Sequence, residues 1–125
     1  MKRNMDLVRL LLIVYESVPE DSNVWWWNDT PEIPKFHKEE IDYHIALMCD
    51  AGLLKPTKIK VPKRDEITVG VRMTWDGHDF LEACRDENRW KKAKKIAGKV
   101  GVFTIEILKQ ILAQLVQTQL KQVMG

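Results

Sequence analysis

Apolar residues recur every three or four positions along most of this 125-residue chain, as one face of an α-helix requires. The first helix is expected over Asp6–Val18, where "DLVRLLLIVYESV" is apolar on nearly every side. Such a helix has to be covered on more than one face. A second helix is expected from Lys38 to Gly52, because glycine is a favoured residue just past a helix end.

The second helix has an apolar and a charged face. Helical spacing predicts an inward face made of Ile41, Ile45, Met48 and Ala51. The same spacing predicts an outward face made of Glu39, Asp42, Tyr43, Ala46 and Asp50.

Two strands are expected next, over Leu53–Val61 and Ile67–Met73, since both are rich in β-branched residues. The second strand alternates apolar and other residues, which predicts one apolar stripe formed by Ile67, Val69, Val71 and Met73. Between the strands "PKRDE" predicts a charged turn, so the pair forms a hairpin.

The C-terminal third is expected to be helical. Thr74 is a good N-cap for a helix that carries Phe80, Leu81 and Cys84. That helix continues or restarts through the basic segment "RDENRWKKAKKIAGKVG", which Gly98 and Gly101 are expected to end. A last helix, capped by Thr104, is expected to reach about Val123 and to carry one apolar seam made of Ile105, Leu108, Leu112 and Leu115.

A helix, a glycine stop and a hairpin with a charged tip follow one another in the order of a winged helix. We therefore expect an α+β winged-helix domain over residues 1–88, with basic and amphipathic helices over residues 89–125 packed on it. The segment "WWWNDTPEIPKF" occupies the place of the helix that normally supports a recognition helix. Alternation predicts a short strand there, around Trp25–Trp27.

Charge is divided unevenly along the chain. Residues 1–54 contain five Lys or Arg and ten Asp or Glu, a net charge of −5, whereas residues 55–125 contain fifteen and eight, a net charge of +7. A basic second half is typical of a surface that binds a polyanion. The alternative is that the two halves only keep the fold in solution.

Enzymatic chemistry has little support in the sequence. None of the common nucleotide-binding, metalloprotease or serine-hydrolase motifs is present, so no catalytic residue and no cofactor is expected. Cys49, Cys84, His44 and His78 have the residue types of a zinc site but lack its spacing, which favours reduced thiols and no metal. No apolar run is long enough to span a membrane, and a cytoplasmic protein is expected.

Two long stretches, "EEIDYHIALMCDAGLL" and "MTWDGHDFLEACRDENRWKK", together with "KRNMDL" near the start, resemble a family of winged-helix proteins of bacteria, phages and prophages catalogued as a domain of unknown function. The resemblance covers nearly the whole chain. It implies a winged-helix fold and a phage or prophage context, and it brings no established activity.

Two functions are open at this point. A small DNA-binding regulator or accessory factor would bind double-stranded DNA mainly through the basic hairpin and the basic helix. The residues expected to contact DNA are Lys35, Lys38, Tyr43, Lys58, Lys60, Lys63, Arg64, Lys91, Lys92 and Lys95.

The other function is that of a protein-interaction module that binds a host or phage protein through the tryptophan run and the acidic outward face of the second helix. Three consecutive tryptophans cannot all be buried in one small core, and tryptophan is enriched in binding hot spots. The seam of the last helix also permits a homodimer, or a cover for the chain's own first helix. The residues expected at protein interfaces are Trp25, Trp26, Trp27, Leu108, Leu112 and Leu115.

Overall fold

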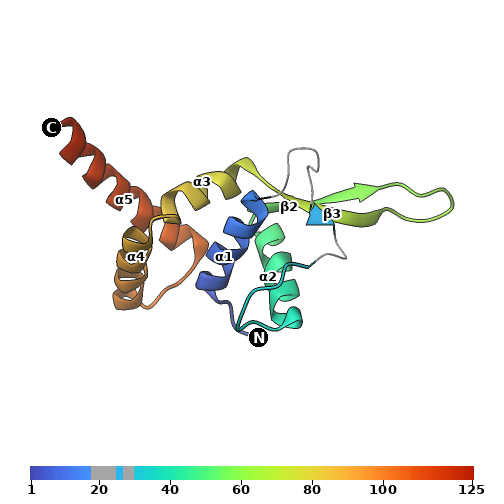
Figure 1. Ribbon diagram of the computed structural model, residues 1–125. Coiled ribbons are helices and arrows are strands. Elements are labelled where there is room, and N and C mark those ends of the chain that lie inside the picture. The colour runs from blue at the N-terminus through green and yellow to red at the C-terminus, as the bar shows by residue number, and fades with distance from the viewer. Residues whose placement is uncertain (18–24, 27–29) are drawn as a thin grey trace. The chain divides into compact units, whose positions relative to one another are not determined.

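The computed structural model describes residues 1–17, 25–26 and 30–125 of the chain. It is an α+β structure that divides into two compact units, Met1–His78 and Asp79–Gly125 (Figure 1). The first unit contains α1 (Met5–Glu16), β1 (Trp25–Trp26), α2 (Lys38–Asp50), β2 (Leu54–Ile59) and β3 (Ile67–Met73). The second contains α4 (Glu87–Val100) and α5 (Ile105–Met124), and α3 (Trp75–Cys84) spans the boundary.

In the first unit, α1 packs against α2 and β3. Its side chains Leu7, Leu11 and Leu12 are fully buried, and Asn4 caps its first turn through Oδ1, which accepts from the amides of Asp6 and Leu7 at 3.0 and 3.3 Å. The predicted helix is confirmed. Ile13 is exposed, so one side of this very apolar helix does face solvent.

His44 belongs to the core of the first unit rather than to its edge. The side chain is fully buried, and its Nε2 accepts a hydrogen bond from the Asn4 amide at 2.8 Å. Its Nδ1 lies 2.8 Å from the Glu40 carbonyl oxygen, which can only accept. These two bonds select the neutral tautomer with its proton on Nδ1 and tie the start of α1 to α2.

The predicted inward face of α2 is right in three of its four positions. Ile41, Ile45 and Met48 are buried, but Ala51 is exposed because it is the C-cap residue, where the helix has ended. Gly52 follows with φ of 78°, the left-handed conformation that glycine adopts readily.

The sheet has the strand order β1-β3-β2, with both neighbouring pairs antiparallel. The register of the β2–β3 hairpin shifts by one residue. Thr57 pairs with Gly70, but Lys58 pairs with Thr68, so Val69 has no partner of its own in β2. This irregularity breaks the alternation of β3. Ile67 was predicted to share a face with Val71, yet Val71 is buried and Ile67 is exposed.

The start of α3 is fixed to the junction between α2 and β2. The Thr74 amide donates to the Leu53 carbonyl at 3.0 Å, and the Thr74 hydroxyl accepts from the Gly77 amide at 3.0 Å, as predicted for an N-cap. A Cβ on Gly77 would overlap the Leu53 carbonyl oxygen and approach Met73 Cγ within 2.7 Å. Only glycine therefore allows this close approach of helix and backbone.

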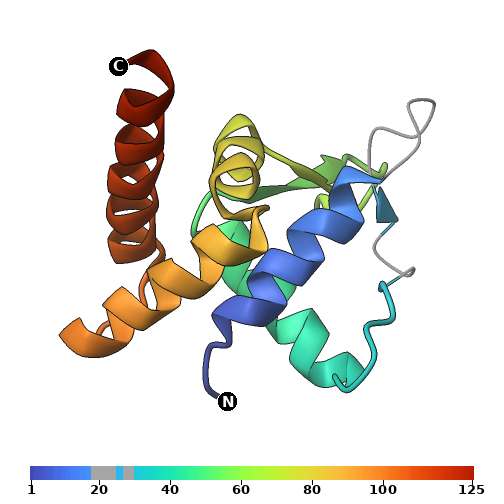
Figure 2. The ribbon, with the colours of Figure 1, turned by 60° about the vertical axis from the view of Figure 1, so that its left-hand side comes forward.

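In the second unit the basic segment restarts as a separate helix. Asp86 caps α4 by accepting from the Arg89 amide at 2.8 Å, and Gly101, with φ of 81°, ends it. Gly98 was predicted to end the helix too, but it lies within α4. Thr104 caps α5 as predicted, and α5 packs on α4 after a short connection (Figure 2). Within the described ranges, no helix is both long and apolar enough to cross a bilayer.

Candidate nucleic-acid interface

The basic side chains of the β2–β3 hairpin form the first part of the candidate interface. All are exposed, and none forms an ion pair or hydrogen bond with any residue that the structure describes. We call Lys55, Lys58, Lys60, Lys63, Arg64 and Arg72 the hairpin cations.

One pair of hairpin cations is placed unfavourably for stability. Lys55 and Arg72 are directly opposite each other in the register of β2 and β3. Like charges in that position destabilise a strand pair. A bound anion would remove the repulsion.

At the hairpin tip the backbone itself holds a lysine in place. The Arg64 amide donates to the Val61 carbonyl at 3.1 Å, and the residues between them are Pro62 and Lys63, the latter with φ of 66°. This is the arrangement of a type II turn, whose third position favours glycine. A lysine there costs about 1–2 kcal/mol relative to an ordinary conformation.

The same turn occurs a second time, just before α2. The Phe36 amide donates to the Ile33 carbonyl at 3.2 Å, and Pro34 precedes Lys35, whose φ is 74°. Lys35 is exposed, like Lys63. Two of the lysines predicted to contact DNA thus occupy left-handed positions behind a proline.

The outward face of α2 is acidic, and its one lysine is already paired. Lys38 Nζ lies 2.6 Å from Asp42 Oδ2, and this contact raises the pKa of Lys38. Asp42 Oδ1 also accepts from the Thr30 hydroxyl at 2.9 Å, so this half-buried carboxylate has a structural role. Glu39 and Asp50 are exposed as predicted.

Tyr43 is the remaining residue of α2 that was predicted to contact DNA. Its side chain is exposed on the outward face, and its ring meets the buried His44 ring edge-on with centroids 5.9 Å apart.

In the second unit, α4 presents a stripe of lysines opposite its buried face. Trp90, Ala93 and Ala97 are buried, and Lys94 lies over the Trp90 ring at 5.9 Å from its centroid. The predicted contact residues Lys91, Lys92 and Lys95, with Lys99, are exposed.

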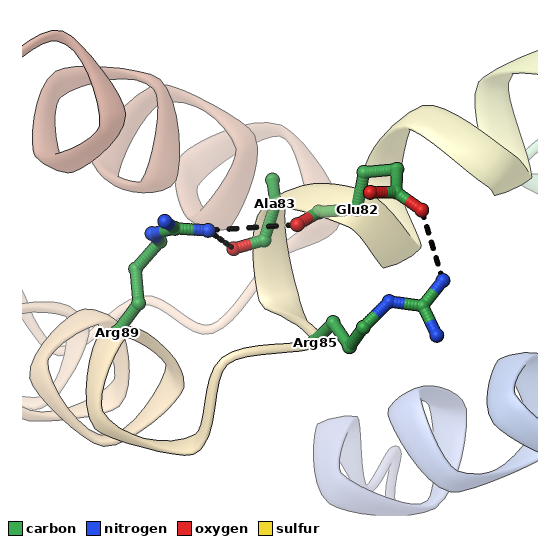
Figure 3. A network of polar contacts seen from close by, with 4 residues as sticks. All are labelled: Glu82, Ala83, Arg85 and Arg89. Carbon is green, nitrogen blue, oxygen red and sulfur yellow. Dashed lines mark hydrogen bonds and ion pairs between the residues drawn. The ribbon is translucent and has the colours of Figure 1, made fainter. Parts of the chain in front are cut away.

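The arginines near α4 serve the fold instead. Arg89 Nη1 donates to the Ala83 carbonyl at 3.1 Å and approaches that of Glu82 at 3.5 Å, which satisfies the end of α3 (Figure 3). Its Nε and Nη2 donate to Gln119 of α5 at 3.1 and 2.7 Å. Arg85 pairs with Glu82 at 2.9 Å.

The predicted protein-interface residues fall into two groups. Leu108 and Leu112 are fully buried and Leu115 is half-buried on α5, while the large apolar residues exposed on this helix are Leu120, Val123 and Met124. Trp25 and Trp26 pair through their backbones with Val71 and Gly70 of β3. Their side chains, and Trp27 as a whole, lie outside the described part of the chain.

Sequence reasoning missed one residue with a strong binding signature. Trp75, the first residue of α3, is 80% exposed although its backbone is fixed through Thr74 and Gly77. The sequence gives no clear signal for this exposure, because the residue after the N-cap of α1, Met5, is buried.

The two cysteines are both reduced thiols within helices of the fold. Burial, with the charge of Asp50, raises the pKa of Cys49, which keeps this thiol protonated. Cys84 is buried, and the described residues contain no group of three or more His, Cys, Asp or Glu able to hold a metal ion.

Comparison with known proteins places the chain in a family. Residues 2–103 match the family model described as "Hypothetical protein (DUF2513)", and the chain belongs to that family. It is also similar to a Haemophilus influenzae protein described as "Uncharacterized protein", with 29% identity over 123 residues that cover 96% of this chain and 99% of the relative. No solved structure matches.

Proposed function

We propose that this member of the DUF2513 family is a non-catalytic DNA-binding protein of the winged-helix type, a small regulator or accessory factor that uses the β2–β3 hairpin as its wing. The order α1, α2, β2, β3 supports the winged-helix assignment. A phage or prophage context, implied by the sequence resemblance, is part of the same proposal.

The observation that carries the proposal is the unpaired state of the hairpin cations. Six exposed Lys and Arg side chains lie on one hairpin, and they face only Asp65 and Glu66 at its tip. Binding to duplex DNA takes most of its salt-dependent affinity from such residues, each of which neutralises a phosphate.

Helix α2 contributes less to DNA affinity in this proposal than a recognition helix usually does. Its exposed carboxylates Glu39 and Asp50 repel phosphates, and Lys38 already forms an ion pair with Asp42. The lysine stripe of α4 is a second basic surface, which adds affinity without base specificity.

A salt series of duplex binding tests the proposal. Replacing Lys58, Lys60, Lys63 and Arg64 with Ala removes four phosphate contacts, each worth about 0.9 in the slope of log K against log salt concentration. We expect the slope to fall by up to about 3.6 and the affinity at low salt to fall by orders of magnitude. Fluorescence anisotropy with random-sequence duplex measures both quantities.

The matched control carries the same charge change elsewhere. Replacing Lys2, Arg3, Lys109 and Lys121 with Ala lowers the net charge equally but leaves the hairpin intact. This control should keep most of the wild-type slope. Equal slopes in the two variants would assign the binding to net charge alone and remove the hairpin from the proposal.

A protein-interaction module is the second candidate, and the exposed Trp75 favours it. An 80% exposed indole on a helix start whose backbone is fixed is typical of a binding hot spot. The acidic face of α2, with Tyr43 exposed between its carboxylates, is a further surface for a basic partner. If this function holds, Trp75→Ala abolishes capture of a host protein while duplex affinity is unchanged.

A further inference from the structure

The tip half of the hairpin carries an apolar pair that the fold does not bury. Ile59 and Ile67 are directly opposite each other in the register, and they are 47% and 42% exposed. Two β-branched side chains side by side on a projecting hairpin (Figure 1) form an apolar ridge in water.

The register shift sets the face on which this ridge lies. β2 contains no extra residue, so its alternation places Ile59 with Lys55 and Thr57, away from the buried Leu54. Ile67 lies on the same face as its partner Ile59. The unpaired Val69 is one extra residue in β3, and it reverses the face on which the residues before it lie. The ridge thus shares a face with Lys55 and Arg72, four residues of β2 further toward the base.

The chemistry of this face fits one kind of ligand surface. The cationic pair at the base is suited to contact anions, and at about 3.3 Å per residue the ridge lies roughly 13 Å beyond it. The turn Val61–Arg64 adds Pro62 and two more cations past the ridge. The minor groove of DNA is flanked by phosphates, and isoleucine and proline are among the apolar residues that insert between base steps there and unstack them.

We propose that Ile59 and Ile67 form a wedge that enters the minor groove and bends the DNA. This inference rests on the proposed DNA-binding function and adds a deformation to it. Unstacking a base step costs free energy, which burial of the two isoleucines and closer contact with the phosphates offset. Flexible steps such as TA reduce that cost, so sites that contain them bind more tightly than stiff A-tracts.

The test separates bending from charge. Fluorescence energy transfer between dyes at the two ends of a short duplex reports the bend angle, and a salt series on the same duplex reports phosphate contacts. The variant Ile59→Thr, Ile67→Thr keeps β-branched residues but loses the apolar ridge. We expect it to bind about tenfold more weakly and to lose the bend, with an unchanged salt slope. Wild type is expected to bend the duplex by at least about 20°.

A conservative variant supplies the control, since Ile59→Val, Ile67→Val retains apolar side chains and should retain most of the bend. The wedge is overturned if wild type binds duplex without bending it, or if the threonine variant bends it equally. Loss of binding to phosphatidylserine vesicles, with DNA binding and bending unaffected, would also overturn it and identify a membrane-surface contact. If wild type fails to bind any duplex, the proposed function itself fails, which the hairpin-cation variant and its control show independently.

Discussion

Helix α2 and the β2–β3 hairpin differ in whether their cationic side chains are paired within the fold. On α2, Lys38 is bound to Asp42, and the charges left exposed are the carboxylates Glu39 and Asp50. On the hairpin, six cations have no partner among the described residues, and two of them face each other across the strands. Helix α2 thus pairs its one lysine within the fold, whereas the hairpin leaves all six of its cations unpaired among the described residues and places two of them where they repel each other.

Burial differs between the same two elements. One face of α2 is fixed in the core by Ile41, Ile45, Met48 and the doubly hydrogen-bonded His44. The tip half of the hairpin leaves even its isoleucines half in solvent. Helix α2 has the residues that core packing requires, which is typical of a structural element. The hairpin keeps residues that do not stabilise the fold, and a ligand is expected to bind at such an element.

The largest expected effect is a loss of stability when a core residue of α2 is replaced. His44→Ala leaves a cavity and removes the partners of the Asn4 amide and the Glu40 carbonyl. We expect a loss of about 3 kcal/mol or more in the free energy of unfolding. Urea denaturation followed by circular dichroism measures it.

His37→Ala is the matched control, because His37 is exposed and makes no side-chain cap bond at the start of α2. It should change stability by less than about 0.5 kcal/mol. If both variants lose the same stability, the two hydrogen bonds of His44 do not hold α1 to α2.

A smaller loss of stability is expected when the same substitution, Ile→Thr, is made in α2 and in the hairpin. Ile41→Thr puts a hydroxyl into the core and removes a buried methyl group, for which we expect a loss of about 2 kcal/mol. Ile67→Thr keeps a β-branched residue at an exposed strand position and should cost less than about 0.5 kcal/mol. Thermal melts of the two single variants measure the difference, and equal losses would mean that the ridge belongs to the core.

Much of this fold follows from local patterns in the sequence. The helical spacing predicts α1, α2 and α5, the two β-branched runs predict the hairpin, and Thr74 and Thr104 cap the helices they precede. These features depend on residues close together in the chain, so periodicity and capping chemistry are enough to find them.

The departures arise from contacts between distant residues. The role of His44 depends on Asn4, forty residues away, and helical spacing alone puts an imidazole at position 44 only beside the core face. The register shift at Val69 exposes Ile67, although an uninterrupted alternation predicts it buried. Gly98 was misread as a helix end because a glycine within a basic run is as typical of a C-cap as of a tolerated helix position.

The candidate site is predictable as a list of charges but not as an arrangement. Counting lysines and arginines identifies the hairpin and α4 as basic, whereas the count gives no sign that Arg89 holds α3 and α5 or that Lys38 is paired. Hydrophobic periodicity also does not predict the left-handed conformation of Lys35 and Lys63, which follow Pro34 and Pro62. The third position of a type II turn usually holds glycine.

Lys35 and Lys63 allow the contributions of α2 and the hairpin to be compared with one matched substitution, for which the smallest effects are expected. Lys35→Gly and Lys63→Gly make the same chemical change in the same type of turn, one beside α2 and one at the hairpin tip. Each relieves a left-handed lysine, and the greater freedom of glycine in the unfolded chain offsets part of the gain. Both variants should therefore be as stable as wild type or more stable by up to about 1 kcal/mol.

DNA binding should separate the two variants where stability does not. Loss of one phosphate contact lowers the salt slope by about 0.9, and we expect this full decrease for Lys63→Gly. Lys35 lies beside the acidic start of α2, with Glu39 and Glu40 in its first turn, so its variant should lower the slope by less than half as much. Anisotropy titrations at four or more salt concentrations resolve the difference. A larger decrease for Lys35→Gly would transfer the main contact from the hairpin to the start of α2, because a turn of the same type and an equal charge leave position as the only variable.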